Sequence, residues 1–262
     1  MNDVTSLAPA DPVGATATAA PERSVVRSIE TALGRLVEIP AALLVVAEIV
    51  LLFAGVVSRY VFHRPLIWSD ELASILFLWL AMYGAVVAFR RSEHMRMPAV
   101  VAKCDPAMRA FLDVFGTAAA LAFLLMMALP SYDYAYEESF ITTPALEVSN
   151  TWRAAALPIG IGLMVLFALL RLVRQANRKQ TVVALLSVAA IAGAFWLAQP
   201  VLRPLGNLNL IIFFVGVVAF CVFAGVPIAF AFGLSIFGYL ILTTHTPTMV
   251  LVGRMDEGMS HL

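Results

Sequence analysis

The sequence predicts an all-α integral membrane protein, because of its composition and the length of its apolar runs. Hydrophobic residues make up 61% of the 262 residues and charged residues 13%, whereas a soluble domain is about half apolar and about a quarter charged. A membrane-spanning helix needs about 20 apolar residues, and a strand of a membrane barrel about 10. The apolar runs of this chain are long and do not alternate with polar residues, so they predict helices and not a barrel.

Apolar runs follow one another along the chain at residues 39–58, 69–89, 110–129, 154–170, 182–200 and 208–243. The first five each have about the length of one crossing. The last run is too long for one simple crossing, and Gly225, Val226 and Pro227 lie near its middle, where proline kinks or breaks a helix. It is either one kinked crossing that continues into an interfacial helix or a short hairpin.

Two segments precede the first run. Residues 1–21 are rich in Ala, Thr and Pro and offer little to bury, so they predict a disordered N-terminal tail. Residues 22–38 carry apolar side chains at helical spacing and charged side chains on the other face. This pattern predicts an amphipathic helix that lies in the membrane surface. The alternative is a cytoplasmic extension of the first membrane-spanning helix.

The distribution of charge predicts the orientation. Most of the 17 Lys and Arg residues lie in segments 22–38, 90–109 and 171–179, which the successive crossings bring to one side. The loop at 131–150, on the other side, has acidic residues and no basic residue. The positive-inside rule then places the N-terminus in the cytoplasm and this loop outside. After five crossings the chain emerges outside near Arg203.

Charged and aromatic side chains gather where the first run ends and the second begins: Arg59, Trp68, Asp70 and Glu71. The loop between the two runs is short, so Arg59 can reach Asp70 or Glu71. Both carboxylates also lie in the first turn of a helix, where the helix dipole favours anions. We predict that these residues either lock the two helices together or contact a partner protein at the outer mouth, and the lock is the preferred interpretation.

The other end of the second run predicts a cytoplasmic boundary, marked by Arg90, Arg91, His94 and Arg96. Glu48 lies near the middle of the first run, where an ionisable group costs about 2.5–3.5 kcal/mol on insertion scales. It is either an ion or proton site or a partner in an interhelical hydrogen bond. The second interpretation is preferred, because the other runs offer few polar groups that could converge on Glu48.

Several classes of function find no support in the sequence. The net charge is zero, so no overall positive charge favours binding to nucleic acid. Cys104 and Cys221 do not form a disulfide framework. The chain has no H-E-x-x-H, G-x-S-x-G or Walker A motif, and its four histidines are scattered. We therefore expect no metal site, no cofactor and no enzymatic activity.

Two stretches together resemble one protein family. The first motif block, at 59–97, contains R-Y-V-F, W-S-D-E-L, Trp79, Gly84 and His94, with Met95 where the family usually has Ile. The second motif block, at 143–160, contains T-P-A-L, Trp152, Pro158 and Gly160. Both resemble the small permease subunit, DctQ type, of tripartite ATP-independent periplasmic (TRAP) transporters. The resemblance covers about residues 22–178, and it implies a bundle of four transmembrane helices.

The C-terminal part is similar to a second type of subunit. G-V-P-I-A-F at 225–230 and R-M-D-E-G at 254–258 look like the start of the large permease, DctM type. The expected organisation is then a tail at 1–21, a small permease at 22–180, a linking fifth transmembrane helix at 181–206, and a large-permease fragment at 207–262. Because a large permease is several hundred residues long, we expect either a piece of a fused permease or a truncated reading frame.

The resemblance implies a scaffold subunit in a bacterial inner-membrane transporter that imports organic acids with a Na⁺ gradient. Its implied partners are a DctM-type large permease, a DctP-type periplasmic binding protein and the lipid membrane. Substrate and sodium sites are expected in the rest of the large permease, so no such residue can be assigned here. The alternatives are a membrane-embedded enzyme or redox subunit, and a self-contained carrier.

Overall fold

The computed structural model describes residues 20–91, 105–174, 178–244 and 246–260. In these residues the regular secondary structure is helical, apart from an isolated β-bridge between Thr142 and Ser149. Within these residues, five helices are long and apolar enough to cross a membrane, or six if a bent pair counts as one span. The chain is thus a multi-pass membrane protein, as the apolar runs predicted. Most of the predicted tail at 1–21 lies outside the described residues, as do His94, Arg96 and Cys104.

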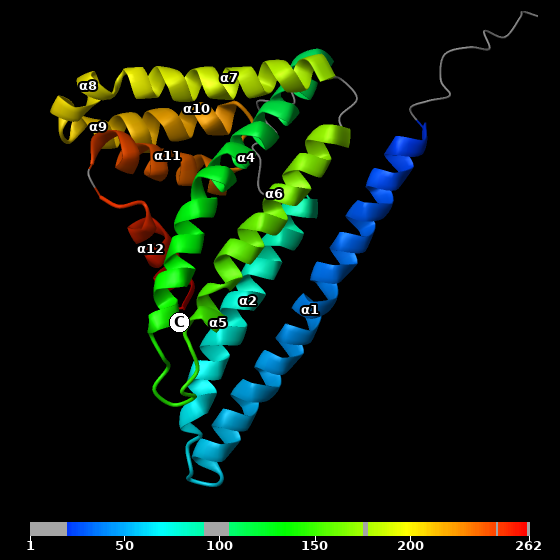
Figure 1. The fold of residues 1–262 in the computed structure, drawn as a ribbon, viewed down its shortest axis with the longest axis vertical. Helices are drawn as coiled ribbons and strands as arrows, with labels where there is room; N and C mark the ends of the chain where they lie inside the picture. The colour runs from blue at the N-terminus through cyan, green and yellow to red at the C-terminus, as the bar shows by residue number, and fades with distance from the viewer. Residues whose placement is uncertain (1–19, 92–104, 175–177, 245, 261–262) are drawn as a thin grey trace, which may run out of the picture.

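Four long helices form a tilted bundle (Figure 1). They are α1 (Ala20–Tyr60), α2 (Ile67–Arg91), α4 (Pro106–Glu137) and α6 (Ala156–Arg174). The short helices η1 (Glu138–Phe140) and α5 (Thr151–Ala154) lie in the connection between α4 and α6. Each of the first four apolar runs falls within this bundle, which agrees with the four-helix expectation.

The N-terminal part of α1 differs from the preferred prediction. Residues 22–38 and the first apolar run form one continuous helix of 41 residues, and Pro40 lies inside it. Figure 1 shows α1 as a straight rod, with no bend between an in-plane part and a spanning part. The alternative, an extension of the first membrane-spanning helix, is therefore the arrangement that the structure has. Helical periodicity continues through both segments, so the pattern alone could not separate them.

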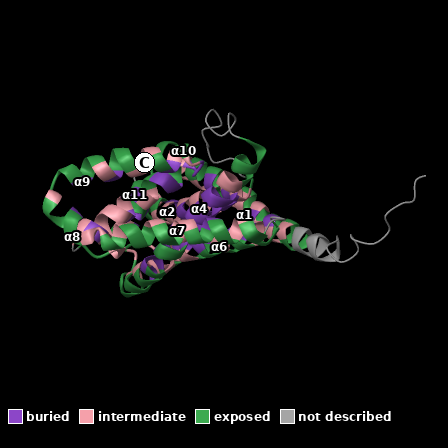
Figure 2. Ribbon diagram, turned by 90° about the horizontal axis from the view of Figure 1, so that it is seen from above, coloured by how far each residue is buried: buried purple, intermediate pink, exposed green. Residues whose placement is uncertain are grey.

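The hydrophobic core is centred on α4. Buried side chains of α4, such as Leu124 and Met127, belong to one cluster with Leu78 of α2 and Leu157 of α6. Figure 2 shows the buried residues gathered around α4, while α1 is largely exposed or intermediate. A Cβ added at Gly160 would lie 2.4 Å from Cε of Met82, so α6 and α2 pack closely at this point.

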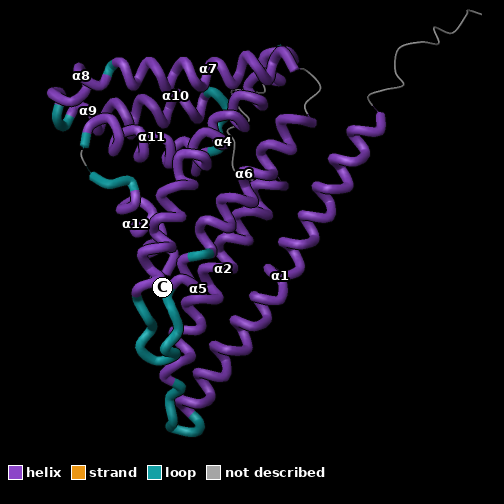
Figure 3. The backbone as a smooth tube through the Cα atoms, in the orientation of Figure 1, coloured by secondary structure: helices purple, strands orange, loops and turns teal. Residues whose placement is uncertain are grey.

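The fifth apolar run becomes α7 (Arg178–Leu197), followed by α8 (Gln199–Leu202) and η2 (Arg203–Leu205). Figures 1 and 3 show α7 running across one end of the bundle and not alongside its four helices. A flat membrane that all four bundle helices cross would not be crossed by α7 in this arrangement. Helix α7 has the length and composition of a crossing, and the fifth crossing stays a prediction.

The last apolar run is a hairpin, which decides between the two predicted forms. One arm contains α9 (Leu208–Ile211), the π-helical η3 (Ile212–Val217) and α10 (Val218–Phe223), and the other is α11 (Ile228–Thr243). The hydroxyl of Ser235 donates a hydrogen bond of 2.5 Å to the carbonyl of Phe213, so the arms pack side by side. The turn between them contains Gly225, whose φ of 82° lies in the left-handed region that glycine adopts at little cost.

The hairpin rests on α4. A Cβ at Gly116 would lie 2.7 Å from the carbonyl oxygen of Gly225, so the tip of the hairpin touches α4 through two glycines. Further along α4, the ring of Phe123 packs edge-on against the rings of Phe230 and Phe237, at centroid distances of 6.0 and 6.4 Å. After the hairpin, α12 (Met249–Ser260) packs back against α4 and α2.

Candidate functional site

The predicted outer mouth is where α1 ends and α2 begins. The hydroxyl of Ser69 donates to the carbonyl of Leu66 at 2.7 Å and helps to start α2. Arg59 Nη2 lies 3.6 Å from Asp70 Oδ2, so this pair connects the end of α1 to the start of α2. Both side chains are more than half exposed, at 55% and 76%. An ion pair with this exposure contributes about 0–1 kcal/mol, so it is a weak lock.

Glu71 has a different partner from the one that the sequence suggested. The backbone N–H groups of Ala145 and Leu146 donate to its two carboxylate oxygens, at 2.8 and 2.9 Å. These two residues belong to the T-P-A-L turn of the second motif block. The next residue, Glu147, has a φ of 54°, which strains a non-glycine residue. Glu71 therefore fastens a strained turn of the α4–α6 connection to the start of α2.

A second contact joins the two motif blocks. The indole Nε1 of Trp79 donates a hydrogen bond of 2.8 Å to the carbonyl of Trp152. Together with Glu71, and with Gly160 packed on Met82, it fastens the segment 145–160 along α2. The two motif blocks are thus parts of one structural joint. Trp68, the remaining predicted residue at the mouth, lies at the start of α2 with 40% of its surface exposed.

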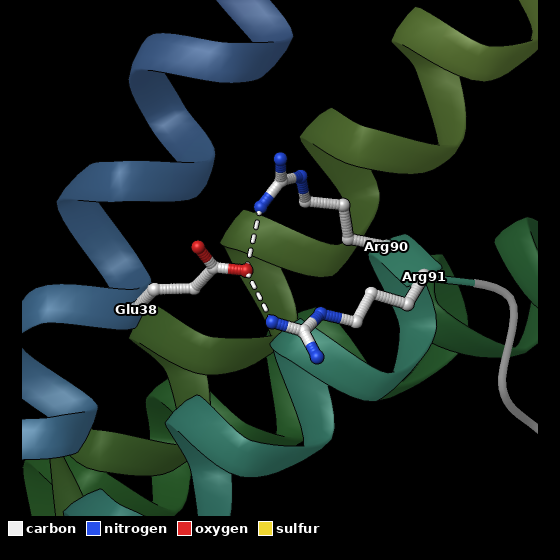
Figure 4. A network of polar contacts seen from close by, with 3 residues as sticks. All are labelled: Glu38, Arg90 and Arg91. Atoms are coloured by element: carbon white, nitrogen blue, oxygen red, sulfur yellow. Dashed lines mark hydrogen bonds and ion pairs between the residues drawn. The ribbon is translucent and has the colours of Figure 1, made fainter.

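The predicted cytoplasmic boundary is a three-residue ion-pair network, drawn in Figure 4. Oε1 of Glu38 accepts hydrogen bonds from Arg90 at 3.0 Å and from Arg91 at 2.9 Å. The guanidinium of Arg90 passes over Gly34, where a Cβ would meet it at 2.1 Å. The sequence pointed to Arg90 and Arg91 as boundary residues, and the structure adds that they hold α2 to α1 through Glu38.

The same end carries another link to α1. Arg174, at the end of α6, donates to Glu30 at 2.8 Å. The N-terminal extension of α1 is therefore tied to both α2 and α6 by charged side chains. His94 and Arg96, the other two predicted boundary residues, lie outside the described part of the chain.

Glu48 is buried, with 8% of its surface exposed. Its Oε2 makes no hydrogen bond to any residue that the structure describes, so the preferred interpretation, an interhelical hydrogen bond, is not observed for this atom. Contacts on either side, Gly34 with Arg90 and Gly55 with Ser69, show that this face of α1 lies against α2. An unsatisfied carboxylate oxygen at a helix interface carries an energetic cost that the described residues do not offset.

One polar cluster was missed by the sequence analysis. Asp256 of α12 is 1% exposed. Its Oδ2 accepts hydrogen bonds from the hydroxyl of Tyr134 at 2.7 Å and from Nη2 of Arg153 at 2.5 Å. Asp256 lies 103 positions after Arg153 and 122 positions after Tyr134, so no local motif joins the three residues. The only sequence signal was an acidic side chain, Asp256, four positions after the apolar Val252.

The described residues contain no group of three or more His, Cys, Asp or Glu side chains that could hold a metal ion. The polar contacts described here join helices and connections to one another. Their chemistry is that of hydrogen-bonded and ionic contacts, with carboxylate oxygens paired at Glu38 Oε1, at both oxygens of Glu71 and at Asp256 Oδ2.

Residues 48–178, half of the chain, match the family described as "Tripartite ATP-independent periplasmic transporters, DctQ component". The chain is 32% identical over 117 residues to the sialic acid TRAP transporter permease protein SiaT of Haemophilus influenzae, which covers 45% of this chain and 19% of that protein. It is 25% identical over 139 residues to the sialic acid TRAP transporter small permease protein SiaQ of Vibrio cholerae, covering 53% and 79%.

A third relative is the C4-dicarboxylate TRAP transporter small permease protein DctQ of Rhodobacter capsulatus, which is 29% identical over 101 residues, covering 38% of this chain and 44% of that protein. The match thus spans about a fifth of SiaT, but most of the small permease SiaQ. Both motif blocks lie within the matched residues, as do α2, α4, α6 and the last part of α1, whereas the first part of α1 precedes them. The chain belongs to the DctQ family of TRAP transporter small permeases, which is a family of membrane transport components and not of enzymes.

Proposed function

We propose that this chain is the scaffold subunit of a TRAP-type secondary transporter that imports organic acids. The relatives are named for sialic acid and for C4-dicarboxylates, which are both carboxylates, so a carboxylate is the proposed class of substrate. The energy source would be a Na⁺ gradient, and a periplasmic binding protein would deliver the substrate. These elements belong to the assembled transporter, to which this chain contributes the small permease.

One observation carries the scaffold role: the two motif blocks join into a single fixed joint. Glu71 and Trp79 of α2 hold the segment 145–152 at both ends through hydrogen bonds of 2.8–2.9 Å. At the other end of the bundle, Glu38 ties α1 to α2. The bundle between these ends has a continuous apolar core. Such a body suits the stationary side of a transporter, against which another domain can move.

The partners follow from this role. A large permease of the DctM type would contact the bundle within the membrane, where the exposed apolar face of α1 offers a surface for it or for lipid. A binding protein of the DctP type would dock at the outer mouth, near Arg59, Asp70 and the acidic segment at 131–150. The family implies a location in the bacterial inner membrane, and the positive-inside rule favours an N-terminus in the cytoplasm.

The segment 207–262 is, in this proposal, the beginning of a large permease fused to the small one. The hairpin and α12, which follow α7, support this division of the chain. They pack on the outside of α4 as separate elements and do not add a fifth long helix to the bundle. Helix α7 would be the link between the two parts.

The first test is a pull-down from detergent-solubilised membranes with this chain tagged at its N-terminus. We expect recovery of a large permease, or of a longer fused form of this chain. Proteoliposomes with this chain alone should show no uptake of labelled sialic acid or succinate. The assembled transporter, with its binding protein, should take up one of them when Na⁺ is present outside. Uptake by the chain alone would contradict the scaffold role and favour a self-contained carrier.

A further inference from the structure

Helix α12 returns to the bundle after the hairpin and presents two different faces. On one face, Val252 is 0% and Asp256 1% exposed. On the other face, Arg254 and Glu257 pair with each other at 2.7 Å and are more than half exposed. The two acidic neighbours Asp256 and Glu257 are therefore in opposite environments. The buried one lies against α4 and α5, while the exposed one stays on the surface of α12.

The surface that receives Asp256 comes from two elements of the bundle. Tyr134 lies near the end of α4, and Arg153 lies in α5, just after the second motif block's turn. Their hydroxyl and guanidinium groups converge on the same oxygen, Oδ2, at 2.7 and 2.5 Å. The side chain of Arg153 is itself 17% exposed, so most of it is removed from water. A buried guanidinium needs an anionic partner, and an uncharged side chain would leave its charge uncompensated.

Arg153 is held in position by the joint between the motif blocks. The preceding residue, Trp152, accepts the hydrogen bond from Trp79. Asn150, three residues before Arg153, donates through its side chain to Glu138 in the α4–α5 connection. The receiving surface is thus built next to the joint between the two motif blocks.

We infer that Tyr134 and Arg153 form a carboxylate-binding surface on the bundle, whose partner is Asp256 of α12. This contact holds the segment after the hairpin against the bundle. Few apolar side chains of α12 are fully buried, and Val252 is the most enclosed, so the ionic contact decides between docked and undocked α12. The docking concerns this chain alone; only its interpretation as the joint between a small permease and a large-permease segment rests on the proposed function.

The test uses the full chain with Cys104 and Cys221 replaced by serine and Val252→Cys as a reporter. Reaction of this thiol with a water-soluble maleimide is slow while α12 is docked and fast when it leaves the bundle. We expect Asp256→Asn to raise the labelling rate about tenfold, because it leaves Arg153 without its anionic partner. The matched control is Glu257→Gln, which removes the neighbouring exposed carboxylate and should leave the rate unchanged.

Further variants separate docking from general loss of folding. All proteins are compared by gel filtration and by helical circular dichroism, and a sample in SDS gives the rate for a fully exposed thiol. The exchange Arg153→Asp with Asp256→Arg should restore slow labelling, which a loss of fold would not. The inference is overturned if Asp256→Asn is labelled at the same rate as the parent chain with the Val252→Cys reporter. It is also overturned if Glu257→Gln raises the labelling rate as much as Asp256→Asn does, or if the parent is labelled as fast as in SDS. If Asp256→Asn speeds the labelling but the pull-down recovers no permease, the docking contact at Asp256 is supported and the scaffold role is contradicted.

Discussion

Asp70 and Glu71 are adjacent carboxylates at the start of α2, yet they have different roles. Asp70 makes an exposed ion pair with Arg59 at 3.6 Å. Glu71 accepts two backbone N–H groups from a turn 74 and 75 residues further along the chain. Backbone groups that lose a charged acceptor must find water or stay unsatisfied, whereas the exposed Arg59 is hydrated in any case. The second carboxylate is therefore the more important of the two for stability.

This difference gives a prediction at the scale of single residues. Glu71→Gln keeps one oxygen acceptor and places an amide against the second N–H, so it should lower the midpoint of thermal unfolding by more than Asp70→Asn does. Asp70→Asn should cost no more than about 1 kcal/mol. Thermal unfolding of both variants in the same detergent, followed by circular dichroism, measures the difference. An equal loss in the two variants would show that the turn does not depend on Glu71.

At the scale of elements, the connection between the hairpin and α4 depends on the absence of side chains. Gly116 of α4 faces the carbonyl of Gly225, and a Cβ there would also lie 3.5 Å from Cα of Val226. Both atoms belong to the backbone of the turn, so they cannot move aside as a flexible side chain would. The same turn needs Gly225 for its φ of 82°. Gly116 thus allows the close approach of the hairpin to α4, and Gly225 allows the turn of the hairpin itself.

Gly116→Ala should therefore separate the hairpin tip from α4 and destabilise the chain by about 1–3 kcal/mol. Gly162 of α6 is the matched control, because a Cβ there would meet nothing within 4 Å. Gly162→Ala should be neutral or stabilising by up to about 1 kcal/mol, since alanine favours the helix. Thermal unfolding in detergent compares the two. A Gly116→Ala variant as stable as Gly162→Ala would contradict the contact.

On the scale of the whole molecule, the two ends of the bundle differ in charge and in construction. One end has the Glu38 network and the Arg174–Glu30 pair, which involve arginines of α2 and α6. The other end has the acidic segment at 131–150, which comprises the end of α4 and the connection to α6, and the contact of Asp256 with Arg153 and Tyr134. The positive-inside rule connects this asymmetry to the two sides of the membrane.

The orientation can be checked with two cysteines. Native Cys104 lies in the segment that we predict to be cytoplasmic, and Ile141, which is 53% exposed, lies in the connection predicted to be outside. In a Cys221→Ser background, a membrane-impermeant maleimide added to spheroplasts should label Ile141→Cys of a Cys104→Ser variant. It should label native Cys104 only after the membrane is permeabilised. The reverse pattern would invert the predicted topology.

The sequence alone was sufficient to predict the helices of the bundle, because a run of about 20 apolar residues is a local property that predicts a membrane helix. It also identified Arg59 with Asp70, and Arg90 with Arg91, as charged residues at helix ends. The lengths of two helices, α4 and α1, were less predictable. The apolar run of α4 stops at residue 129, yet the helix continues through Pro130 to Glu137 and thereby carries Tyr134 to Asp256. Helix α1 likewise continues through the segment for which a separate in-plane helix was predicted.

The partners of the polar side chains were decided only by the tertiary structure. Glu71 with Ala145, Trp79 with Trp152, and Arg153 with Asp256 are pairs separated by 73 to 103 residues. Nothing local selects such partners, since each depends on how the helices between them pack and cross. The form of the last apolar run could not be predicted from the sequence for the same reason, because Pro227 interrupts the helix both in a kinked crossing and in a hairpin. In the structure the chain turns back at Gly225, and this turn packs on α4 at Gly116, a contact between distant segments.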